Sequence, residues 1–381
     1  MRVRMNSIQR AFGEVSKCGE IAISDLAQSL DLRPSTLNEK LRTLQRKGLV
    51  EFRAGRKRIG LNANFGTVVG IDMGASHLHF ALADFCGEIL KDALVKVRPE
   101  DGPRKMIRQM KVGIRALTSR IGRRPMALAV GVPSPVDPER GVVAFANNLP
   151  GWKNIHLGHE LEKEFRVPVV LENDANMAAI GEHWRGVARG VNNFVFIALG
   201  TGIGSGIFVD GRLCRGRTGS AGEVYRMNIE WQRWNEDFGE TGYLESHASG
   251  LGISAEGRKV LPAPVAEAAG LGQERDAYFV FEAMRQGNPA ARAVLEKCFT
   301  MLGVGVANLV AVLDPDLIVF GGGVVKGSPD FLLRTVNKVL RRIQPDPPPI
   351  KLSSLGDKAQ TCGAIFSALT LAQESLVRRR P

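Results

Sequence analysis

The feature that most constrains this chain is a repeated order of strand, glycine-rich turn and strand. An apolar segment, a turn that contains Gly74 and a second apolar segment make up residues 68–90, and the same order returns in residues 193–213. A third segment, residues 317–325, again leads from an apolar strand into three glycines. Such turns present backbone N–H groups with little side-chain bulk, which is what a phosphate group requires. The repeat predicts two α/β lobes with a nucleotide in the cleft between them.

The phosphate-binding prediction depends on this repetition, because a single glycine-rich turn is common in ordinary hairpins. The sequence contains no G-x-x-x-x-G-K-[ST] motif, so a P-loop is not expected. Between the two hairpins, Val169–Leu171 predicts a short strand, and Asp174 stands where the chain turns into a helix. A carboxylate in such a place can take a proton from a hydroxyl nucleophile. The alternative is an N-cap aspartate that only holds the start of the helix, and the surrounding motifs favour the catalytic interpretation.

Residues 1–64 follow a different pattern, that of a small helical domain. Apolar spacing predicts a first helix over about residues 3–16 and a second helix with Ser24 as its N-cap. A third helix is expected to begin with Ser35 as its N-cap and to end at Gly48. Two short strands then flank a basic tip. This order is the plan of a winged helix-turn-helix domain, whose third helix enters the major groove of DNA.

The charge of this domain fits a polyanionic partner. Residues 1–66 contain 13 Lys/Arg and 6 Asp/Glu, a net charge of +7 out of +12 for the whole chain. Charge alone fits a solvated basic surface equally well, but spacing, caps and charge agree, so DNA binding is favoured over a protein-interaction domain. The third helix is expected to read base edges, and the wing cations to contact phosphates. The predicted DNA-binding residues are Ser35, Thr36, Asn38, Arg42, Arg56, Lys57 and Arg58.

Length and composition are those of a soluble protein of two or three domains. The chain has 381 residues, of which 44% are hydrophobic and 24% charged. Its apolar runs end before the ~18 residues that a membrane span needs, and its N-terminus lacks the apolar region of a secretory signal. The five scattered cysteines include no CxxC pair. A cytoplasmic location without a membrane partner is expected, and the four tryptophans are expected to be packing residues.

Together these motifs resemble the ROK family (repressors, open reading frames, sugar kinases), which has the actin-like ATPase fold. The N-terminal domain makes the chain similar to the regulator branch, represented by xylose and N-acetylglucosamine repressors. The resemblance implies an α/β protein with a winged helix-turn-helix domain at 1–64 and a two-lobed sugar-kinase-like domain at 65–381. Its small lobe is expected at about 65–175 plus the C-terminal helix, and its large lobe at about 176–362. The segments that carry the resemblance are GIDMGAS, GVPSPVD, NLPGW, LENDAN, ALGTGIGSG, GSAGE, GYLESHASG and VFGGGV.

The resemblance also implies roles for single residues. Asp174 is the expected general base, which activates a sugar hydroxyl for attack on the γ-phosphate of ATP. ATP and Mg²⁺ are therefore the expected cofactors if the chain is a kinase. The expected sugar-binding residues are Asn148, Asn173, Asp174, Glu223 and Glu245. The residues expected around phosphates, Mg²⁺ and adenosine are Asp72, Gly74, Ser76, Gly200, Thr201, Gly202, Gly204, Gly321 and Gly322.

One departure from the family pattern concerns a structural zinc site. Family members typically hold zinc with a histidine after a Gly-Glu pair and with three cysteines in C-x-C-G-x-x-G-C. The matching positions here are Arg226, Glu236, Phe238 and Tyr243, which are not a zinc ligand set, so no metal is expected. Packing by Phe238 and Tyr243 is expected to brace this loop in place of the metal.

The sequence leaves two functions open. The first is that of a transcriptional repressor, in which a sugar closes the cleft between the lobes. This motion repositions the DNA-binding domains of a homodimer, or of a dimer of dimers, on operator DNA. The second is an ATP-dependent kinase of hexoses or N-acetylhexosamines, and both activities can coexist in one chain. A structural actin-like scaffold is a third possibility, which the sugar-side motifs disfavour. The preferred hypothesis is a sugar-responsive transcriptional regulator that binds a small-molecule sugar and operator DNA.

Overall fold

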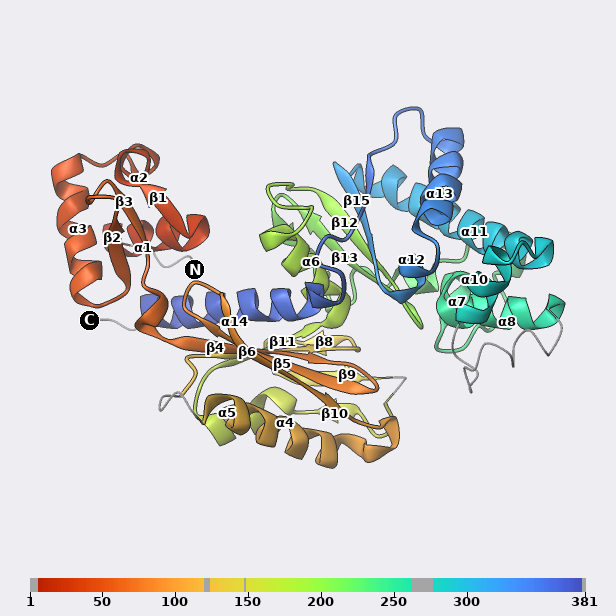
Figure 1. Ribbon diagram of the computed structural model, residues 1–381, viewed down its shortest axis with the longest axis horizontal. Coiled ribbons are helices and arrows are strands. Elements are labelled where there is room, and N and C mark those ends of the chain that lie inside the picture. The colour runs from red at the N-terminus through yellow and green to blue at the C-terminus, as the bar shows by residue number, and fades with distance from the viewer. Residues whose placement is uncertain (1–5, 120–123, 147–148, 262–276, 379–381) are drawn as a thin grey trace.

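The computed structural model describes residues 6–119, 124–146, 149–261 and 277–378 (Figure 1). The chain forms a small N-terminal domain followed by two lobes, each built on a five-stranded sheet. The sheet of the first lobe has the order β11-β7-β4-β5-β6, and that of the second has the order β14-β13-β12-β15-β16. The architecture is therefore mixed α/β, as the sequence predicts.

The N-terminal domain has three helices and a three-stranded sheet of order β1-β3-β2. Its core is the apolar stripe of the third helix, Leu37, Leu41 and Leu44, packed with residues of the other elements. The predicted order of helices and hairpin is confirmed, whereas β1 was not predicted because three residues carry no periodic signal. The elements are α1 (Ser7–Cys18), β1 (Glu20–Ala22), α2 (Ile23–Leu30), α3 (Pro34–Arg46), β2 (Val50–Arg53) and β3 (Arg58–Leu61).

The two predicted serine caps are wrong. Helix α2 begins at Ile23, whose N–H donates to the carbonyl of Lys57 in the wing, so pairing of β1 with β3 sets the helix start. Ser24 instead donates its hydroxyl to Asp25 at 2.9 Å. Helix α3 begins at Pro34 because proline has a fixed φ and lacks an N–H, both suited to the first helical position, so Ser35 already lies inside the helix.

The first lobe places two helices on one face of its sheet and the C-terminal helix on the other (Figure 1). Strands β4, β7 and β11 are parallel, while β4, β5 and β6 are antiparallel. Three short strands form a second sheet of order β10-β9-β8 beside it. The elements are η1 (Ala63–Phe65), β4 (Thr67–Met73), β5 (His77–Asp84), β6 (Ile89–Lys96), η2 (Pro99–Asp101), α4 (Gly102–Thr118), β7 (Leu128–Val132), β8 (Val136–Asp137), β9 (Val142–Phe145), β10 (Lys153–Ile155), α5 (Leu157–Phe165), β11 (Val169–Asn173) and α14 (Ala359–Arg378).

The second lobe repeats the hairpin of the first. Strands β12 and β13 are antiparallel across the second glycine-rich turn, as β4 and β5 are across the first, and β15 lies parallel to β12. The elements are β12 (Phe194–Leu199), β13 (Ile203–Val209), β14 (Arg212–Leu213), η3 (Val224–Arg226), η4 (Trp231–Arg233), α7 (Gly242–Ala248), α8 (Gly250–Val260), α10 (Tyr278–Arg285), α11 (Pro289–Leu313), β15 (Leu317–Gly321), α12 (Gly323–Gly327), α13 (Pro329–Ile343), β16 (Ile350–Leu352) and η5 (Gly356–Lys358).

Among the described helices, only α11 is long and apolar enough to cross a membrane by length and composition. Its residues Leu295, Phe299 and Val306 are buried in the core of the second lobe. This environment is that of a core helix.

Helix α6 (Asp174–Arg185) joins the two lobes and crosses α14 at glycines. A Cβ on Gly363 would lie 1.8 Å from the carbonyl oxygen of Met177, and a Cβ on Gly181 would lie 2.2 Å from that of Ala359. The two backbones are therefore too close for any other residue. The carboxylate of Glu182, fully buried on α6, accepts hydrogen bonds from Ser353 Oγ at 2.5 Å and from the Val187 N–H at 2.9 Å. These bonds tie α6 to the second lobe at the crossing.

The N-terminal domain is packed against the first lobe through three phenylalanines. The ring of Phe85, fully buried after β5, lies 5.0 Å from that of Phe65 and 6.5 Å from that of Phe12 on α1. The Phe85 N–H donates to the carbonyl of Ala63 at 3.3 Å. Because aromatic and backbone contacts act together, we expect the N-terminal domain to move with the first lobe as one unit.

Truncation of the central ring tests this attachment. The substitution Phe85→Ala is expected to lower the free energy of unfolding by about 3 kcal/mol, since it leaves a cavity beneath two aromatic rings. It is also expected to speed trypsin cleavage in the N-terminal domain. The matched control is Phe145→Ala, at a side chain that is 37% exposed. A cost below about 1 kcal/mol for Phe85→Ala would show that the domain is only loosely attached.

Candidate functional site

Asp174 is the first residue of α6, at the point where the two lobes meet. The N-cap is Asn173, whose Oδ1 accepts hydrogen bonds from the N–H groups of Ala175 and Asn176 at 3.0 and 3.1 Å. The alternative of an N-cap Asp174 is therefore wrong, although its Oδ1 also accepts from Ala175 N–H at 2.7 Å. Burial raises the pKa of Asp174 to about 7, with a contribution from the charges of Asp72 and Glu223. A carboxyl that titrates near neutrality is suited to general base catalysis.

Glu223 and Glu245 bring two further carboxyls towards this position. Glu245 on α7 accepts a hydrogen bond at 2.7 Å from the N–H of Ile203, directly after the second glycine-rich turn. A Cβ on Gly202 would lie 2.4 Å from Glu245 Oε2, so the carboxylate is seated against that turn. Burial raises the pKa of Glu245 to about 7, and the charge of Glu223 adds to the shift. Burial also raises the pKa of Glu223. Because Glu223 acts on both Asp174 and Glu245, the three carboxyls form one acidic cluster.

A further predicted sugar ligand, Asn173, has its side chain engaged within the protein. The Oδ1 of Asn173 caps α6, and its Nδ2 lies 3.4 Å from the carbonyl oxygen of Ser134, so this side chain supports Asp174. Asn148 lies outside the described residues. Among the described residues, the predicted sugar contacts that remain are Asp174, Glu223 and Glu245.

Glu172, which lies two residues before Asp174, was not among the predicted site residues. Its carboxylate is 3% exposed and accepts from Arg215 Nε at 2.7 Å and from Asn176 Nδ2 at 2.9 Å. Arg215 follows β14 of the second lobe, whereas Glu172 lies within β11 of the first. This ion pair therefore connects the two lobes directly behind Asp174. A glutamate inside an otherwise apolar strand was the only signal that could have revealed it.

In the first glycine-rich turn, Asp72 is engaged by two neighbours. Its carboxylate is 4% exposed and lies 3.4 Å from His77 Nε2. The amide of Gln360, at the start of α14, donates to both carboxylate oxygens at 2.7 and 2.9 Å. The hydrogen bond to Asp72 raises the pKa of His77, and a Cβ on Gly74 would lie 2.4 Å from the His77 ring. Ser76 is exposed. The histidine thus covers the turn that was predicted to hold phosphate.

The second and third glycine-rich segments line one cavity of about 490 Å³. Gly200 and Thr201 of the second turn face Gly323 and Lys326 of α12 across it. The other lining residues are Gly250, Ala277, Tyr278, Phe281, Arg285, Val324 and Gly327. Its size and its backbone N–H groups with two cations match a nucleotide.

Gly200 and Thr201 are the predicted cofactor residues that line this cavity, whereas the predicted glycines Gly74, Gly202, Gly204, Gly321 and Gly322 lie outside its lining. A Cβ on Gly204 would lie 2.8 Å from that of Ala175, so Gly204 allows α6 to approach the second sheet. Gly321 lies against the ring of Phe196, and Gly322 adopts a φ of 103° against the carbonyl of Leu199. Gly321 and Gly322 therefore shape the turn from β15 into α12.

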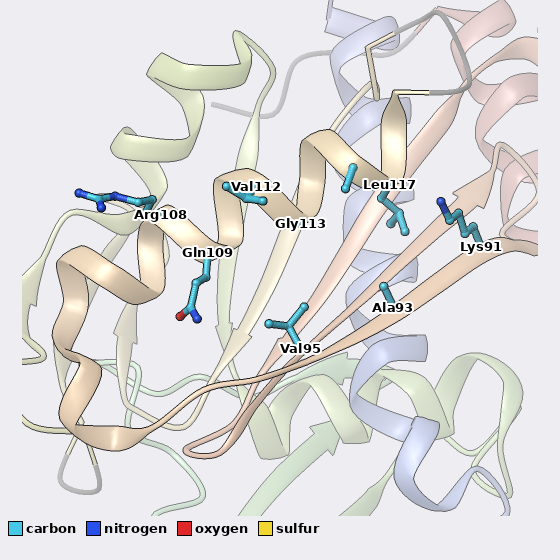
Figure 2. Close-up of a pocket in the computed structure, with 9 residues that line it drawn as sticks. Lys91, Ala93, Val95, Arg108, Gln109, Val112, Gly113 and Leu117 are labelled. Atoms are coloured by element: carbon cyan, nitrogen blue, oxygen red, sulfur yellow. The ribbon is translucent and has the colours of Figure 1, made fainter.

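A separate cavity of about 310 Å³ lies between β6 and α4 on the first lobe (Figure 2). Its lining is mainly apolar and includes Val95, Val112 and Leu117, with Arg108 and Lys91 at its two sides. None of the predicted site residues lines it.

The predicted DNA-binding residues lie on two exposed elements of the N-terminal domain. Ser35, Thr36, Asn38 and Arg42 belong to α3, with Ser35 and Arg42 exposed and the other two partly exposed. The wing residues Arg56, Lys57 and Arg58 are exposed at the tip between β2 and β3. Arg58 also forms an ion pair with Glu20 of β1 at 2.5 Å, so it braces the wing as well as presenting charge.

The region that contains both lobes matches a known family. Residues 68–371 match the ROK family. The chain is 27% identical over 315 residues to the xylose repressor of Caldicellulosiruptor bescii, a match that covers 79% of each protein. It is 32% identical over 282 residues to the glucokinase of Thermotoga maritima, which covers 73% of this chain and 88% of that one.

Solved structures give the same two kinds of relative. A ROK family transcriptional regulator, a homolog of the E. coli MLC protein, has a TM-score of 0.81 at 24% identity, with 97% of both chains covered. A ROK family glucokinase from Streptomyces griseus in complex with glucose and AMPPNP has a TM-score of 0.68 at 29% identity, covering 80% of this chain and all of that chain. The regulator's match extends over the N-terminal domain, whereas the glucokinase's match covers less of this chain.

The raised pKa of Asp174 predicts a pH-dependent stability difference. Its pKa is about 7 in the folded chain against an ordinary 3.8, so the folded state holds the proton more tightly than the unfolded state. The stability that this proton contributes is complete below about pH 4 and is lost as the pH rises to about 7. Asp174→Asn is therefore expected to unfold at a higher temperature than the native chain at pH 8, with the difference vanishing near pH 4. The control is the exposed Asp346→Asn, and a pH-independent difference would contradict the assignment.

Proposed function

The chain belongs to the ROK family, and from that premise we propose that it is a sugar-responsive transcriptional repressor. It binds operator DNA through α3 and the wing, and a sugar in the cleft at Asp174. The observation that carries this proposal is the joining of a basic, exposed winged domain to two lobes at whose junction three carboxyls cluster. The xylose repressors among its relatives support the same function.

The acidic cluster favours a neutral, hydroxyl-rich ligand. Carboxylates accept hydrogen bonds, and sugar hydroxyls donate them. Burial raises the pKa values of Asp174 and Glu245 to about 7, and the charge of Glu223 adds to both shifts. A ligand that donates hydrogen bonds to the charged forms offsets that cost, whereas an anionic ligand adds to the repulsion. We assign the sugar contacts to Asp174, Glu223 and Glu245.

A continuous path of packed elements connects the sugar site with the DNA-binding domain. Helix α6 carries Asp174 at its start and crosses α14 at Gly363. Helix α14 packs on the sheet of the first lobe, and Phe85 at the end of β5 fixes the N-terminal domain to that sheet. Closure of the lobes on a sugar therefore moves the DNA-binding domain. A coupling of about 1–3 kcal/mol gives a 5–150-fold change in operator affinity.

The repressor acts in the cytoplasm as a homodimer or a dimer of dimers. The support is mechanical: a two-fold operator requires two recognition helices at a fixed separation, and rotation of the two domains destroys that separation. The ligand is thus required to bind the DNA-free arrangement better than the DNA-bound one.

A second function, sugar phosphorylation, is favoured by the cavity of about 490 Å³ beside the second turn. The relatives include glucokinases. ATP with Mg²⁺ supplies the transferable phosphoryl group when bound. Thr201 and Lys326 would hold its phosphates, Asp174 would take the proton from the sugar hydroxyl, and Asp72 would need to exchange its contacts with His77 and Gln360 for the metal side of the site.

Operator binding tests the repressor directly. An operator is first selected from random DNA with the full-length chain. Asn38→Ala is expected to weaken binding to the selected operator by about tenfold or more, because a bidentate base contact is lost, while binding to unrelated DNA stays the same. Arg56→Ala is expected to weaken both to a similar degree and to reduce the salt dependence.

The matched control for these two substitutions is Lys338→Ala, which removes a charge from an exposed side chain of the second lobe. Sugars are then titrated into the operator complex. Equal affinity of all four chains, or no release of DNA by any hexose, N-acetylhexosamine or pentose, would contradict the repressor function.

ADP release with Mg-ATP and the same sugars tests the kinase. If the chain phosphorylates sugar, the rate is expected to rise with pH through about 7 as Asp174 loses its proton. Asp174→Asn is expected to lower it by a factor of about 100 or more. The control is Asp346→Asn, which is expected to leave the rate unchanged. ADP release that does not depend on sugar, or turnover that persists in Asp174→Asn, would exclude Asp174 as the base.

A further inference from the structure

The segment before α7 is organised around one guanidinium group, that of Arg233. Its Nε and Nη2 donate to the two carboxylate oxygens of Glu236 at 2.8 and 2.6 Å. Its Nη1 lies 3.3 Å from Nε2 of His247 on α7. A bidentate pair of this kind fixes the plane of the guanidinium as well as its position. Arg233 is thereby bonded both to its own loop and to α7.

Three aromatic rings surround the same group. The guanidinium carbon lies 5.1 Å from the centre of the Phe238 ring and 5.5 Å from that of Tyr243. Phe238 and Tyr243 meet edge to face at 5.1 Å, and Tyr243 stacks on His247 at 4.4 Å. A guanidinium over an aromatic face is attracted by the negative charge of the ring's π electrons. The sequence-based expectation of packing by Phe238 and Tyr243 thus omits the cation at their centre.

The tryptophans of this segment face outwards. Trp231 and Trp234 are 77% and 78% exposed, whereas the Arg233 side chain between them is 33% exposed. The expectation that all four tryptophans are packing residues is therefore wrong for these two. The loop turns its arginine inwards because only the arginine finds a carboxylate and aromatic faces there.

The family's zinc ligand positions coincide with this cluster. Of the four matching positions, Glu236, Phe238 and Tyr243 all contact Arg233. The fourth, Arg226, accepts no metal, since arginine is a cation without a lone-pair donor, and it donates to the hydroxyl of Tyr225 at 2.9 Å. Within the described part of the chain, no three His, Cys, Asp or Glu side chains are grouped as metal ligands. These residues do not fit zinc.

We propose that Arg233 replaces zinc as the point to which this loop is tied, and that it positions Glu245 for sugar. Three positions that would converge on a metal converge here on a guanidinium. Two of the tied residues, Tyr243 and His247, lie two positions before and after Glu245 on α7. Fixing them fixes the helical turn from which Glu245 reaches Ile203. The chain is thus a sugar sensor whose binding loop is independent of metal supply. The role of Glu245 rests on the proposed sugar-binding function, whereas the role of Arg233 in the loop does not.

The geometry also specifies the state of His247. Arginine only donates, so Nε2 of His247 is the acceptor of this contact, while its Nδ1 lies 2.8 Å from the carbonyl oxygen of Tyr243 and 2.9 Å from the hydroxyl of Ser246. The contact with Arg233 therefore selects the Nδ1–H tautomer of His247. This state is a spectroscopic signature of the contact with Arg233, because a change in overall stability would not select between the two tautomers.

The test compares Arg233→Lys with the native chain and with the control Arg189→Lys, at an exposed arginine after α6. Lysine keeps the charge but loses the bidentate fork and the flat face. We expect the native chain to contain far less than one zinc per chain after expression in zinc-supplemented medium, and a chelator to leave its sugar affinity unchanged. Arg233→Lys is expected to weaken sugar binding about tenfold and to speed hydrogen exchange in residues 228–241, with operator affinity in the absence of sugar unchanged. Arg189→Lys is expected to change none of these.

Nitrogen NMR of the histidine-labelled chain supplies the second arm, with His247→Asn for assignment. The His247 signals are expected to show one fixed tautomer in the native chain and averaging in Arg233→Lys. Stoichiometric zinc, sugar affinity that falls with chelator, or an unchanged His247 signal in Arg233→Lys would each overturn the proposal. If no sugar binds the native chain, the proposed function fails, but hydrogen exchange and the His247 signal still decide whether Arg233 holds the loop.

Discussion

The crossing of α6 and α14 is the contact on which the rest of this molecule depends. At Gly181 and Gly363 the two backbones touch without a side chain between them, so the helices have almost no freedom to slide. The carboxylate of Glu182 ties the crossing to the second lobe, and α14 lies on the sheet of the first. One end of α6 carries Asp174. In the proposed function, sugar binding at Asp174 changes the angle between the lobes, and the N-terminal domain moves with the first lobe because Phe85 packs against it.

The charged forms of the carboxyls at the proposed sugar site are poorly stabilised by the protein itself. Asp174, Glu223 and Glu245 crowd together and resist ionisation. The cations nearby are already engaged: Arg215 with Glu172, and Arg233 with Glu236. None of the three carboxyls belongs to an ion pair among the described residues, although the charge of Arg226 partly offsets the effect of burial on the pKa of Glu223. Hydroxyl groups of a bound sugar would donate hydrogen bonds to these carboxylates and so stabilise their charged forms. In the proposed function, this links the free energy of binding to closure of the lobes.

The sequence predicts the fold because its signals are local and repeated. Matched hairpins around Gly74 and Gly202, and the helices and wing of the N-terminal domain, depend on periodicity and on glycine, so they are visible without a structure. The position of Asp174 at the junction of strand and helix follows from the same pattern. The fold class and the family were predictable on these grounds.

The remaining features arise from residues that are distant in sequence. Glu172 meets Arg215 only when the two lobes assemble, and Asp72 meets Gln360 only when α14 packs on the first sheet, so the spacing of these residues in the sequence predicts neither pair. The predicted serines are not the N-caps of α2 and α3, because a strand pairing and Pro34 set the helix starts and outweigh the N-cap propensity of serine. The role of Arg233 is not predictable from the sequence, because an arginine in a polar loop has no distinctive pattern until its partners are known.

The central claim is that sugar moves the DNA-binding domain relative to the second lobe. The most direct measurement is the distance between two probes introduced as unnatural amino acids, one replacing Arg46 on α3 and the other replacing Lys338 on α13, with and without a bound sugar. The account predicts a shift of the distance distribution on sugar binding, and the loss of that shift in Asp174→Asn when its sugar affinity is lost. An unchanged distribution in a chain that is saturated with sugar would contradict it.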